Sequence, residues 1–219
     1  SPSSAASDVY KRQLDKIADL CEIRFRLEKC GRTQWLSGSY RKVRNYLWRR
    51  LKFHEYVDCK TSISLFVELE ENQKARFRIS VEIDDSGSNP EDYKKHHKIL
   101  NKDINDGHDL VYILAENNSQ PIMKQIDEDT ETVKENLENG TYKKIQISHI
   151  ISQRNIEENN KTNKDIVDEI LDSVKQLIEY YKLAVDENTD GLIDNSIKSS
   201  SSKGDEKMNK NMVLYGPPG

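Results

Sequence analysis

The last residues of the chain form a motif that could bind phosphate. Residues 213–215 are apolar and indicate a short buried strand, and Gly216, Pro217, Pro218 and Gly219 follow it directly. A phosphate-binding loop begins in this way and continues as G-x-x-x-x-G-K-[ST], in which backbone N–H groups surround the phosphates and the lysine reaches the outer ones. The sequence stops before that lysine, so we expect no cofactor to bind this chain by itself. An ordinary Gly-Pro turn is the alternative.

The phrase KNMVLYGPPG at the end of the chain resembles the start of the nucleotide-binding domain of AAA+ proteins, and more narrowly that of McrB-type restriction NTPases. In that family a variable N-terminal domain recognises DNA, often through a modified base. A motor that uses GTP or ATP with Mg²⁺ follows, and a separate nuclease subunit cuts. The resemblance implies that residues 216–219 begin the nucleotide site of an NTPase. It also implies DNA, a nuclease subunit and further copies in an oligomeric ring as partners.

Basic residues are concentrated in one segment, which suggests a polyanionic partner. Residues 21–60 contain eleven Lys and Arg and four Asp and Glu, a net charge of +7, whereas the whole chain carries −4. Within this segment, apolar residues recur over 40–53 at a spacing that predicts a helix capped by Ser39. Its basic side chains could neutralise DNA phosphates and release their counterions. The residues assigned to DNA binding are Trp35, Tyr40, Arg41, Lys42, Arg44, Trp48, Arg49, Arg50 and Lys52.

Three of these residues are aromatic and allow two interpretations. Trp35, Tyr40 and Trp48 could stack on a base that has left the duplex, as base-flipping proteins require. Large aromatic side chains also fill protein cores, and a charged helix face can simply be solvated. The basic side chains therefore carry the DNA prediction, and the aromatic side chains alone do not.

A nuclease site is a further alternative. Asp84 or Asp85 followed by Asp92 and Lys94 has the letters of a metal-dependent nuclease motif. That motif normally lies on strands, however, and Pro90 is placed to begin a helix. A sequence match without the expected strand geometry does not define a catalytic site, so we assign no catalytic residue here.

Histidine and cysteine do not suggest a metal centre. His96, His97 and His108 lie near Asp103 and Asp109 in the sequence, but without the close spacing of metal ligands. The three cysteines lack C-x-x-C spacing and indicate free thiols. We therefore assign no metal ligand.

The N-terminal residues resemble a cloning remnant. Residues 3–13, SSAASDVYKRQ, look like a sequencing adapter that has been translated. A natural disordered tail of small polar residues is the alternative. We expect residues 1–13 to lie outside the native domain.

The remaining pattern predicts an α+β fold in which a small, mostly antiparallel sheet is flanked by helices. Alternating apolar residues indicate an antiparallel hairpin with one buried face. The predicted strands are 62–69, 76–83, 110–114 and 142–151, and the predicted helices are 14–30, 40–53, 90–102, 127–139 and 164–185.

The predicted domain organisation has three native parts. Residues 14–185 form the recognition domain, residues 186–211 a linker rich in Ser, Lys and Asp, and residues 212–219 the first strand of an α/β P-loop domain. The resemblance implies that residues 14–185 are the DNA-recognition domain of a modification-dependent restriction NTPase. The alternative is a protein-interaction or assembly domain of another AAA+ ATPase, with the apolar stripe over 167–181 packing on a partner.

Composition argues against a membrane-spanning protein. Hydrophobic residues make up 35 % of the chain and charged residues 33 %, and no run of about 18 apolar residues occurs. The sequence shows no secretory leader, and free thiols suit a reducing compartment. We expect a cytoplasmic location and no membrane partner.

Overall fold

The computed structural model of the chain describes residues 4–31, 46–69, 74–104, 109–117 and 123–186. These residues belong to one compact unit, Ser1–Asp186. Several predictions concern residues outside this part: the helix cap at Ser39, the linker beyond residue 186 and the phosphate loop over 212–219.

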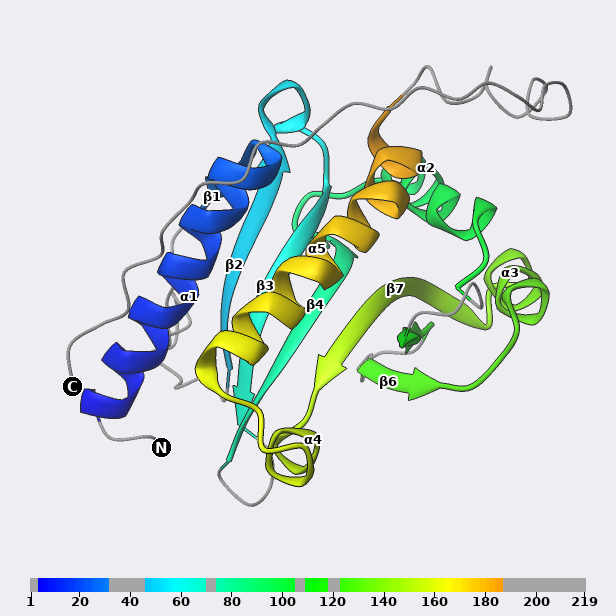
Figure 1. Ribbon diagram of the computed structural model, residues 1–219. Coiled ribbons are helices and arrows are strands. Elements are labelled where there is room, and N and C mark those ends of the chain that lie inside the picture. Colours follow the sequence, from blue (N-terminus) through cyan, green and yellow to red (C-terminus); the bar gives the residue numbers. More distant parts are fainter. Residues whose placement is uncertain (1–3, 32–45, 70–73, 105–108, 118–122, 187–219) are drawn as a thin grey trace, which may run out of the picture. The chain divides into compact units, whose positions relative to one another are not determined.

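One sheet of seven strands forms the centre of the fold, in the order β1-β2-β3-β4-β7-β5-β6 (Figure 1). Each pair of neighbouring strands in it runs antiparallel. The strands are β1 (Leu27–Cys30), β2 (Tyr46–Phe53), β3 (Thr61–Leu69), β4 (Ala75–Ile83), β5 (Leu110–Glu116), β6 (Met123–Ile126) and β7 (Tyr142–Ile151). The predicted α+β class with an antiparallel sheet is confirmed.

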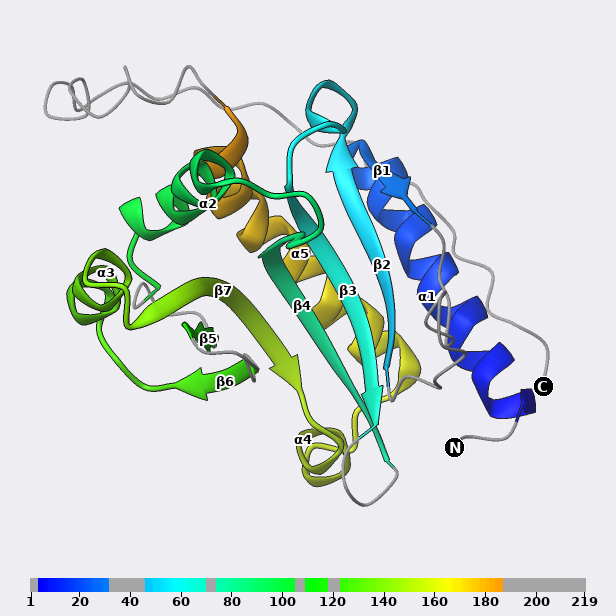
Figure 2. The ribbon, with the colours of Figure 1, turned by 180° about the vertical axis from the view of Figure 1, so that it is seen from behind.

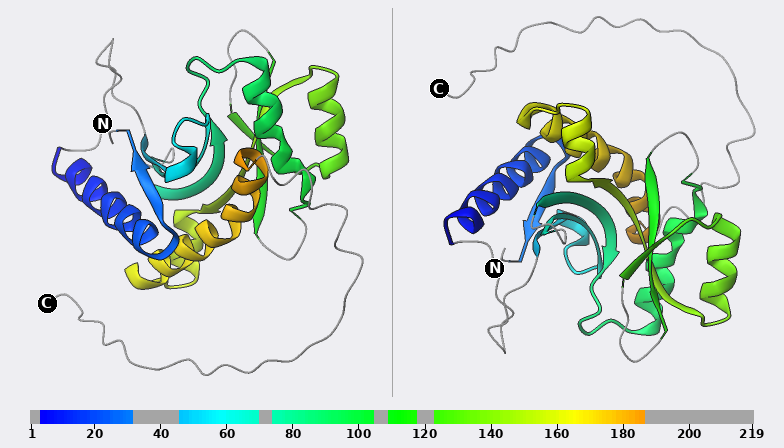
Figure 3. Two further views of the ribbon diagram at one scale, coloured as in Figure 1. Left: turned by 90° about the horizontal axis from the view of Figure 1, so that it is seen from above. Right: turned by 90° about the horizontal axis from the view of Figure 1, so that it is seen from below.

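Two long helices cover one face of the sheet. Helices α1 and α5 lie on the same side of β2, β3 and β4, as the views in Figure 3 show. The shorter helices lie around the far strands and the ends of the sheet (Figure 1). The helices are α1 (Ser4–Phe25), α2 (Pro90–His96), α3 (Thr130–Glu138), α4 (Gln153–Glu158) and α5 (Asn163–Val185), with 3₁₀ turns η1 (His54–Tyr56) and η2 (His97–Asn101).

The core lies between this helix layer and the sheet. Ile63, Leu65 and Val67 alternate along β3 and are buried in one cluster with Val174 and Leu177 of α5. Burying a side chain of this size contributes about 1.5–3 kcal/mol. The period of two in the strands and of 3.6 in α5 therefore explains why these layers face each other.

Strand β2 corrects the predicted helix over 40–53. Residues 46–53 form a strand that pairs with both β1 and β3. Leu47 and Leu51 are both fully buried, and they are four residues apart. A spacing of four fits one face of a helix and also one face of a strand, so the pattern did not distinguish them. Pairing on both edges decides in favour of the strand.

Helix α1 differs from the predicted helix at both ends. It ends at Phe25, and Arg26 takes a left-handed conformation (φ 60°) that turns the chain into β1. The predicted helix continued to Cys30. At the other end α1 begins at Ser4, so it includes most of the residues that resemble an adapter.

The remaining elements follow the sequence pattern with smaller differences. The hairpin of β3 and β4, strands β5 and β7, and helix α5 lie where the sequence predicts them. The helix predicted over 90–102 is divided into α2 and η2, and α3 occupies the centre of the range 127–139. The short elements β1, β6 and α4 were not predicted, because four to six residues show too little periodicity.

Candidate nucleic-acid interface

The second face of the sheet carries mostly polar side chains. In Figure 2 no described helix crosses β2, β3 and β4 on this side. The pairing registers show that alternate residues of four neighbouring strands point to this face. We call this surface the polar face: Tyr46, Trp48 and Arg50 of β2, Ser62, Ser64, Phe66 and Glu68 of β3, Arg76, Arg78, Ser80 and Glu82 of β4, and Lys144, Gln146 and Ser148 of β7.

Serine side chains form the floor of the polar face. Ser64, Ser80 and Ser148 lie opposite one another on three neighbouring strands, and all three are fully buried. The hydroxyl oxygens of Ser80 and Ser148 are 2.5 Å apart. Arg50 lies opposite Ser64 on β2, at the end of this row. Because serine is small, the longer side chains of neighbouring rows have room to lie across the sheet.

Arg78 connects the strands of the polar face. Its guanidinium donates to Glu68 at 2.6 and 2.8 Å, to the Ser80 hydroxyl at 2.8 Å and to the Gln146 side-chain oxygen at 3.0 Å. It also lies 3.7 Å from the centre of the Phe66 ring. Only 11 % of the Arg78 side chain is exposed, so these contacts fix it in place.

Arg76 is the more accessible guanidinium beside it. Its Nε donates to Glu68 at 2.8 Å, and 37 % of its side chain is exposed. Desolvation opposes the charge of Glu68, but Arg78 and Arg76 together hold the pKa of this carboxyl below its usual range. Glu68 therefore stays ionised and orients both arginines.

Glu82 is the second carboxyl of the polar face and has the opposite shift. Desolvation raises its pKa, against the hydrogen bond from Ser64 and the charges of Arg78 and Arg50. The Ser64 hydroxyl donates to Glu82 at 2.6 Å and the Gln146 amide at 3.3 Å. A partly buried carboxyl with a perturbed pKa is common in functional sites and also in structural networks.

Aromatic rings border the arginines. The Tyr46 ring lies 5.9 Å from that of Trp48 and 6.1 Å from that of Phe66, measured between centres. The Arg50 guanidinium lies 5.9 Å from the centre of the Trp48 ring. Tyr46 and Trp48 are partly exposed, whereas Phe66 is buried. Rings and guanidinium groups in this arrangement can bind a flat, polar and anionic ligand.

The structure describes four of the nine residues assigned to DNA. Trp48 and Arg50 lie on the polar face. Arg49 points to the opposite side of β2, where it donates to the Gly31 carbonyl at 2.7 Å and lies 3.5 Å from Asp15 of α1. The others, namely Trp35, Tyr40, Arg41, Lys42 and Arg44, lie outside the described residues.

Lys52 is on the same side of β2 as Arg50, but it is buried. Its ammonium donates to the carbonyls of Val57 at 3.0 Å and Cys59 at 2.5 Å, and desolvation lowers its pKa. This lysine therefore fastens the turn after β2 to the sheet.

Sequence reasoning missed Arg76 and Arg78. The signal was present, since Arg76, Arg78, Ser80 and Glu82 alternate with the apolar residues of β4. The charge count, which concentrated on residues 21–60, drew attention away from this strand.

Two carboxylates of the nuclease alternative, Asp84 and Asp92, make structural contacts. Asp84 accepts from Arg50 at 2.6 Å and from the Ser86 backbone at 3.0 Å. Asp92 belongs to the capping box that begins α2, and Lys94 is exposed. Among the described residues, no group of three or more His, Cys, Asp or Glu side chains gathers in a way that could hold a metal ion.

His96 is buried completely and is bonded on both sides. Its Nε2 lies 2.7 Å from the Ile145 carbonyl and its Nδ1 lies 3.0 Å from the Thr61 hydroxyl. Burial lowers the pKa of His96 to about 3. The ring is therefore neutral, with Nε2–H donating and Nδ1 accepting.

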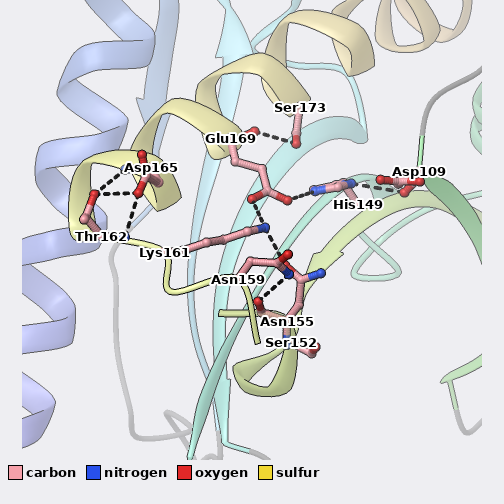
Figure 4. A network of polar contacts seen from close by, with 10 residues as sticks. All are labelled: Asp109, His149, Ser152, Asn155, Asn159, Lys161, Thr162, Asp165, Glu169 and Ser173. Atoms are coloured by element: carbon pink, nitrogen blue, oxygen red, sulfur yellow. Dashed lines mark hydrogen bonds and ion pairs between the residues drawn. The ribbon is translucent and has the colours of Figure 1, made fainter. Parts of the chain in front are cut away.

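A second polar network lies on the helix-covered side (Figure 4). Glu169 of α5 lies 2.9 Å from His149 Nε2 and accepts from Lys161 at 2.5 Å. His149 Nδ1 lies 3.1 Å from the Asp109 carbonyl. Desolvation opposes the charge of Glu169, but Lys161 and His149 lower its pKa. The network ties α5 to β7 and to the start of β5, which is a structural role.

An apolar groove of about 720 Å³ lies between α1, α4 and the start of α5. Ile17, Phe77 and Val167 contribute to its walls. Val9 and Tyr10 also line it, and both belong to the segment that resembles an adapter. Part of the groove wall therefore comes from the segment that resembles an adapter, and the polar face is the better candidate site.

Fold and site together define an α+β domain with a seven-stranded antiparallel sheet. Helices α1 and α5 cover one face of β2, β3 and β4, and the other face of these strands and of β7 carries mostly polar side chains. No protein-family model, curated protein or solved structure matches the chain. None of the helices in the described residues has the length and apolar character needed to span a membrane.

Proposed function

We propose that residues 14–185 are the DNA-recognition domain of a modification-dependent restriction NTPase of the McrB type, and that DNA contacts the polar face. The observation that carries this proposal is that Trp48, Arg50 and Arg76 all lie on the side of the sheet that the described helices leave uncovered. Arginine is suited to phosphate because its planar fork can donate two hydrogen bonds at once.

The motor part of the proposal is supported by the C-terminal sequence. KNMVLYGPPG resembles the first strand and loop of an AAA+ nucleotide site. The full-length protein would then bind GTP or ATP with Mg²⁺, form a ring and act with a nuclease subunit in the cytoplasm. Residues 216–219 would contribute the first glycines of that site.

Binding of the full chain to duplex DNA tests the recognition role. Duplexes with and without modified cytosine or adenine are compared at two salt concentrations. We expect tighter binding to a modified duplex and a steep loss with salt, because each phosphate contact adds about 0.9 to the slope of log K against log salt. The double variant Arg50→Gln with Arg76→Gln should weaken binding about tenfold or more and flatten this slope.

The control is a pair of exposed cations elsewhere. Arg154 of α4 and Lys164 of α5 have side chains that are 84 % and 75 % exposed, so Arg154→Gln with Lys164→Gln removes the same charge from another surface. An equal loss in both double variants would show a general effect of charge. Absence of binding to duplex and to single-stranded DNA at low salt would reject the proposal.

The alternative function is an assembly domain, which the apolar groove favours. The stripe over 167–181 no longer supports it, because Ile170, Val174, Leu177 and Tyr181 are buried within the domain's own core. A protein partner in the groove would bind with little dependence on salt and would be insensitive to the Arg50 and Arg76 variants.

A further inference from the structure

The distribution of charge between helices and strands limits how this domain can bind DNA. Among the described residues, none of the five α-helices has more basic than acidic side chains: α1 and α2 are balanced, and α3, α4 and α5 are acidic. Strand β2, in contrast, contains three basic residues and no acidic one. Proteins that read duplex DNA with a helix place basic and polar residues on it, so that it can enter the major groove. The described helices do not offer this arrangement.

The polar face offers a different kind of contact. Tyr46 and Trp48 present partly exposed rings next to the Arg50 guanidinium. Aromatic rings and arginine planes on a sheet bind bases by stacking, and this requires bases that are not paired in a duplex. In an intact duplex both faces of each base are already covered by its neighbours.

The arginines around the rings are held in position before any ligand arrives. Arg50 donates to Asp84 at 2.6 Å, and Arg76 donates to Glu68 at 2.8 Å. Tyr46, Glu68 and Arg76 lie opposite one another on β2, β3 and β4. The Arg76 guanidinium is therefore two strands away from the Tyr46 ring. Neighbouring strands are about 4.8 Å apart, so the face can hold a base at one strand and a phosphate at another. Side chains fixed in this way lose little entropy on binding.

We propose that the polar face binds unpaired nucleotides, with a base stacked on Trp48 and phosphates on Arg50 and Arg76, in preference to intact duplex. This inference rests on the proposed function, because it assumes that the polar face is the DNA contact. It adds the substrate class: single-stranded DNA, or a strand whose bases have left the helix.

The experiment compares a single-stranded oligonucleotide with the blunt duplex of the same sequence, using the full chain. The chain has two tryptophans, so Trp35→Phe leaves Trp48 as the only indole fluorophore. We expect the single strand to bind at least tenfold more tightly than the duplex and to quench the Trp48 fluorescence. Trp48→Ala should weaken single-strand binding about tenfold, and Trp48→Phe should largely restore it, because loss of one stacked base has an effect of this order.

Circular dichroism and the urea midpoint of each variant show whether it is folded, and Arg154→Gln serves as the folded charge control. Equal or tighter duplex binding that is insensitive to Trp48→Ala would overturn the inference and leave the proposed function standing. Single-strand binding without quenching would also overturn it, since contacts to phosphate alone do not cover the ring. Failure of both oligonucleotides to bind at low salt would reject the proposed function itself.

Discussion

Arg49 and Arg50 are neighbours in the sequence, but the strand directs them to opposite faces. Arg50 lies on the polar face, and Arg49 lies toward α1 with 16 % of its side chain exposed. We predict that Arg49→Gln lowers the free energy of unfolding by about 1–2 kcal/mol, because it loses a charge-assisted hydrogen bond to the Gly31 carbonyl. Its affinity for DNA should stay within about twofold of the unaltered chain.

The matched variant Arg50→Gln should behave in the opposite way. Its partner Asp84 is partly exposed and can be solvated, so stability should change by less than about 1 kcal/mol while DNA affinity falls. Urea unfolding and fluorescence anisotropy with labelled DNA measure the two quantities on the same samples. If both variants lost affinity equally, the assignment of one face of β2 to DNA would be wrong.

His96 should make the domain less stable in mild acid. Its pKa is about 3 in the folded chain because the ring is buried, whereas the pKa of an unfolded histidine is about 6.5. Between these values the unfolded chain takes up a proton that the folded chain does not. The contribution of His96 to the free energy of unfolding is therefore fully present above pH 6.5. It is lost as the pH decreases toward 3, by up to about 1.4 kcal/mol per pH unit.

Urea unfolding at several pH values between 4.5 and 7.5 checks this prediction. His96→Gln should be less stable at pH 7.5 but should show a shallower loss toward pH 4.5. His54 has an 82 % exposed side chain, so His54→Gln is the control for replacing a histidine at the surface. Burial also lowers the pKa of His97 to about 4, so some acid sensitivity should remain in the His96 variant. An unchanged slope in His96→Gln would contradict the assignment.

At the scale of elements, the sequence predicts the helices and strands whose apolar residues recur with a period that fits only a helix or only a strand. Helix α5 and the hairpin of β3 and β4 were predictable for this reason. Strand β2 was not, because Leu47 and Leu51 fit both periods and only its pairing on both edges resolves the choice. The polar face could be predicted only in part, since placing Arg50 on the same face as Arg76 and Arg78 requires the order and register of the strands.

The start of α5 offers a test of local stability. Thr162 is its N-cap: the hydroxyl accepts from the Asp165 backbone, and the Asp165 carboxylate accepts from the Thr162 backbone at 2.8 Å. We predict that Thr162→Ala lowers the free energy of unfolding by about 1 kcal/mol, because the first turn of the helix loses a partner for its free N–H groups. Urea unfolding measures this loss.

Thr162→Ser is the matched variant and should recover most of the stability, since serine is an equally good cap. Lys164→Ala, next to the cap, removes an exposed ion pair with Asp168 and should leave stability almost unchanged, because solvent screens such a pair. A loss in Thr162→Ala no larger than that in Lys164→Ala would show that the capping box contributes nothing to the domain.

At the scale of the whole molecule, the two halves of α1 contribute differently to the buried core. The core positions of α1 are Leu14, Ile17, Ala18 and Cys21, all in the part of the helix beyond residue 13. Before them, Tyr10 packs only partly against the core, and residues 8, 9, 11 and 12 are exposed. The first part of α1 therefore adds helix length but little buried surface.

We predict that a chain lacking residues 1–12 unfolds cooperatively and is less stable by no more than about 2 kcal/mol, since Tyr10 is the one side chain described in this segment that packs against the core. Leu14→Ala in the full chain should cost about 2–5 kcal/mol, because it opens a cavity in the core. The shortened chain should also keep its DNA affinity, because α1 lies on the side of the sheet away from the polar face. Urea unfolding and anisotropy on the shortened chain measure both.

Retained stability and affinity would agree with a foreign origin of residues 3–13. A chain that fails to fold without them would make the segment an integral part of the domain, and the groove that Val9 and Tyr10 line would then become the stronger candidate for a partner site.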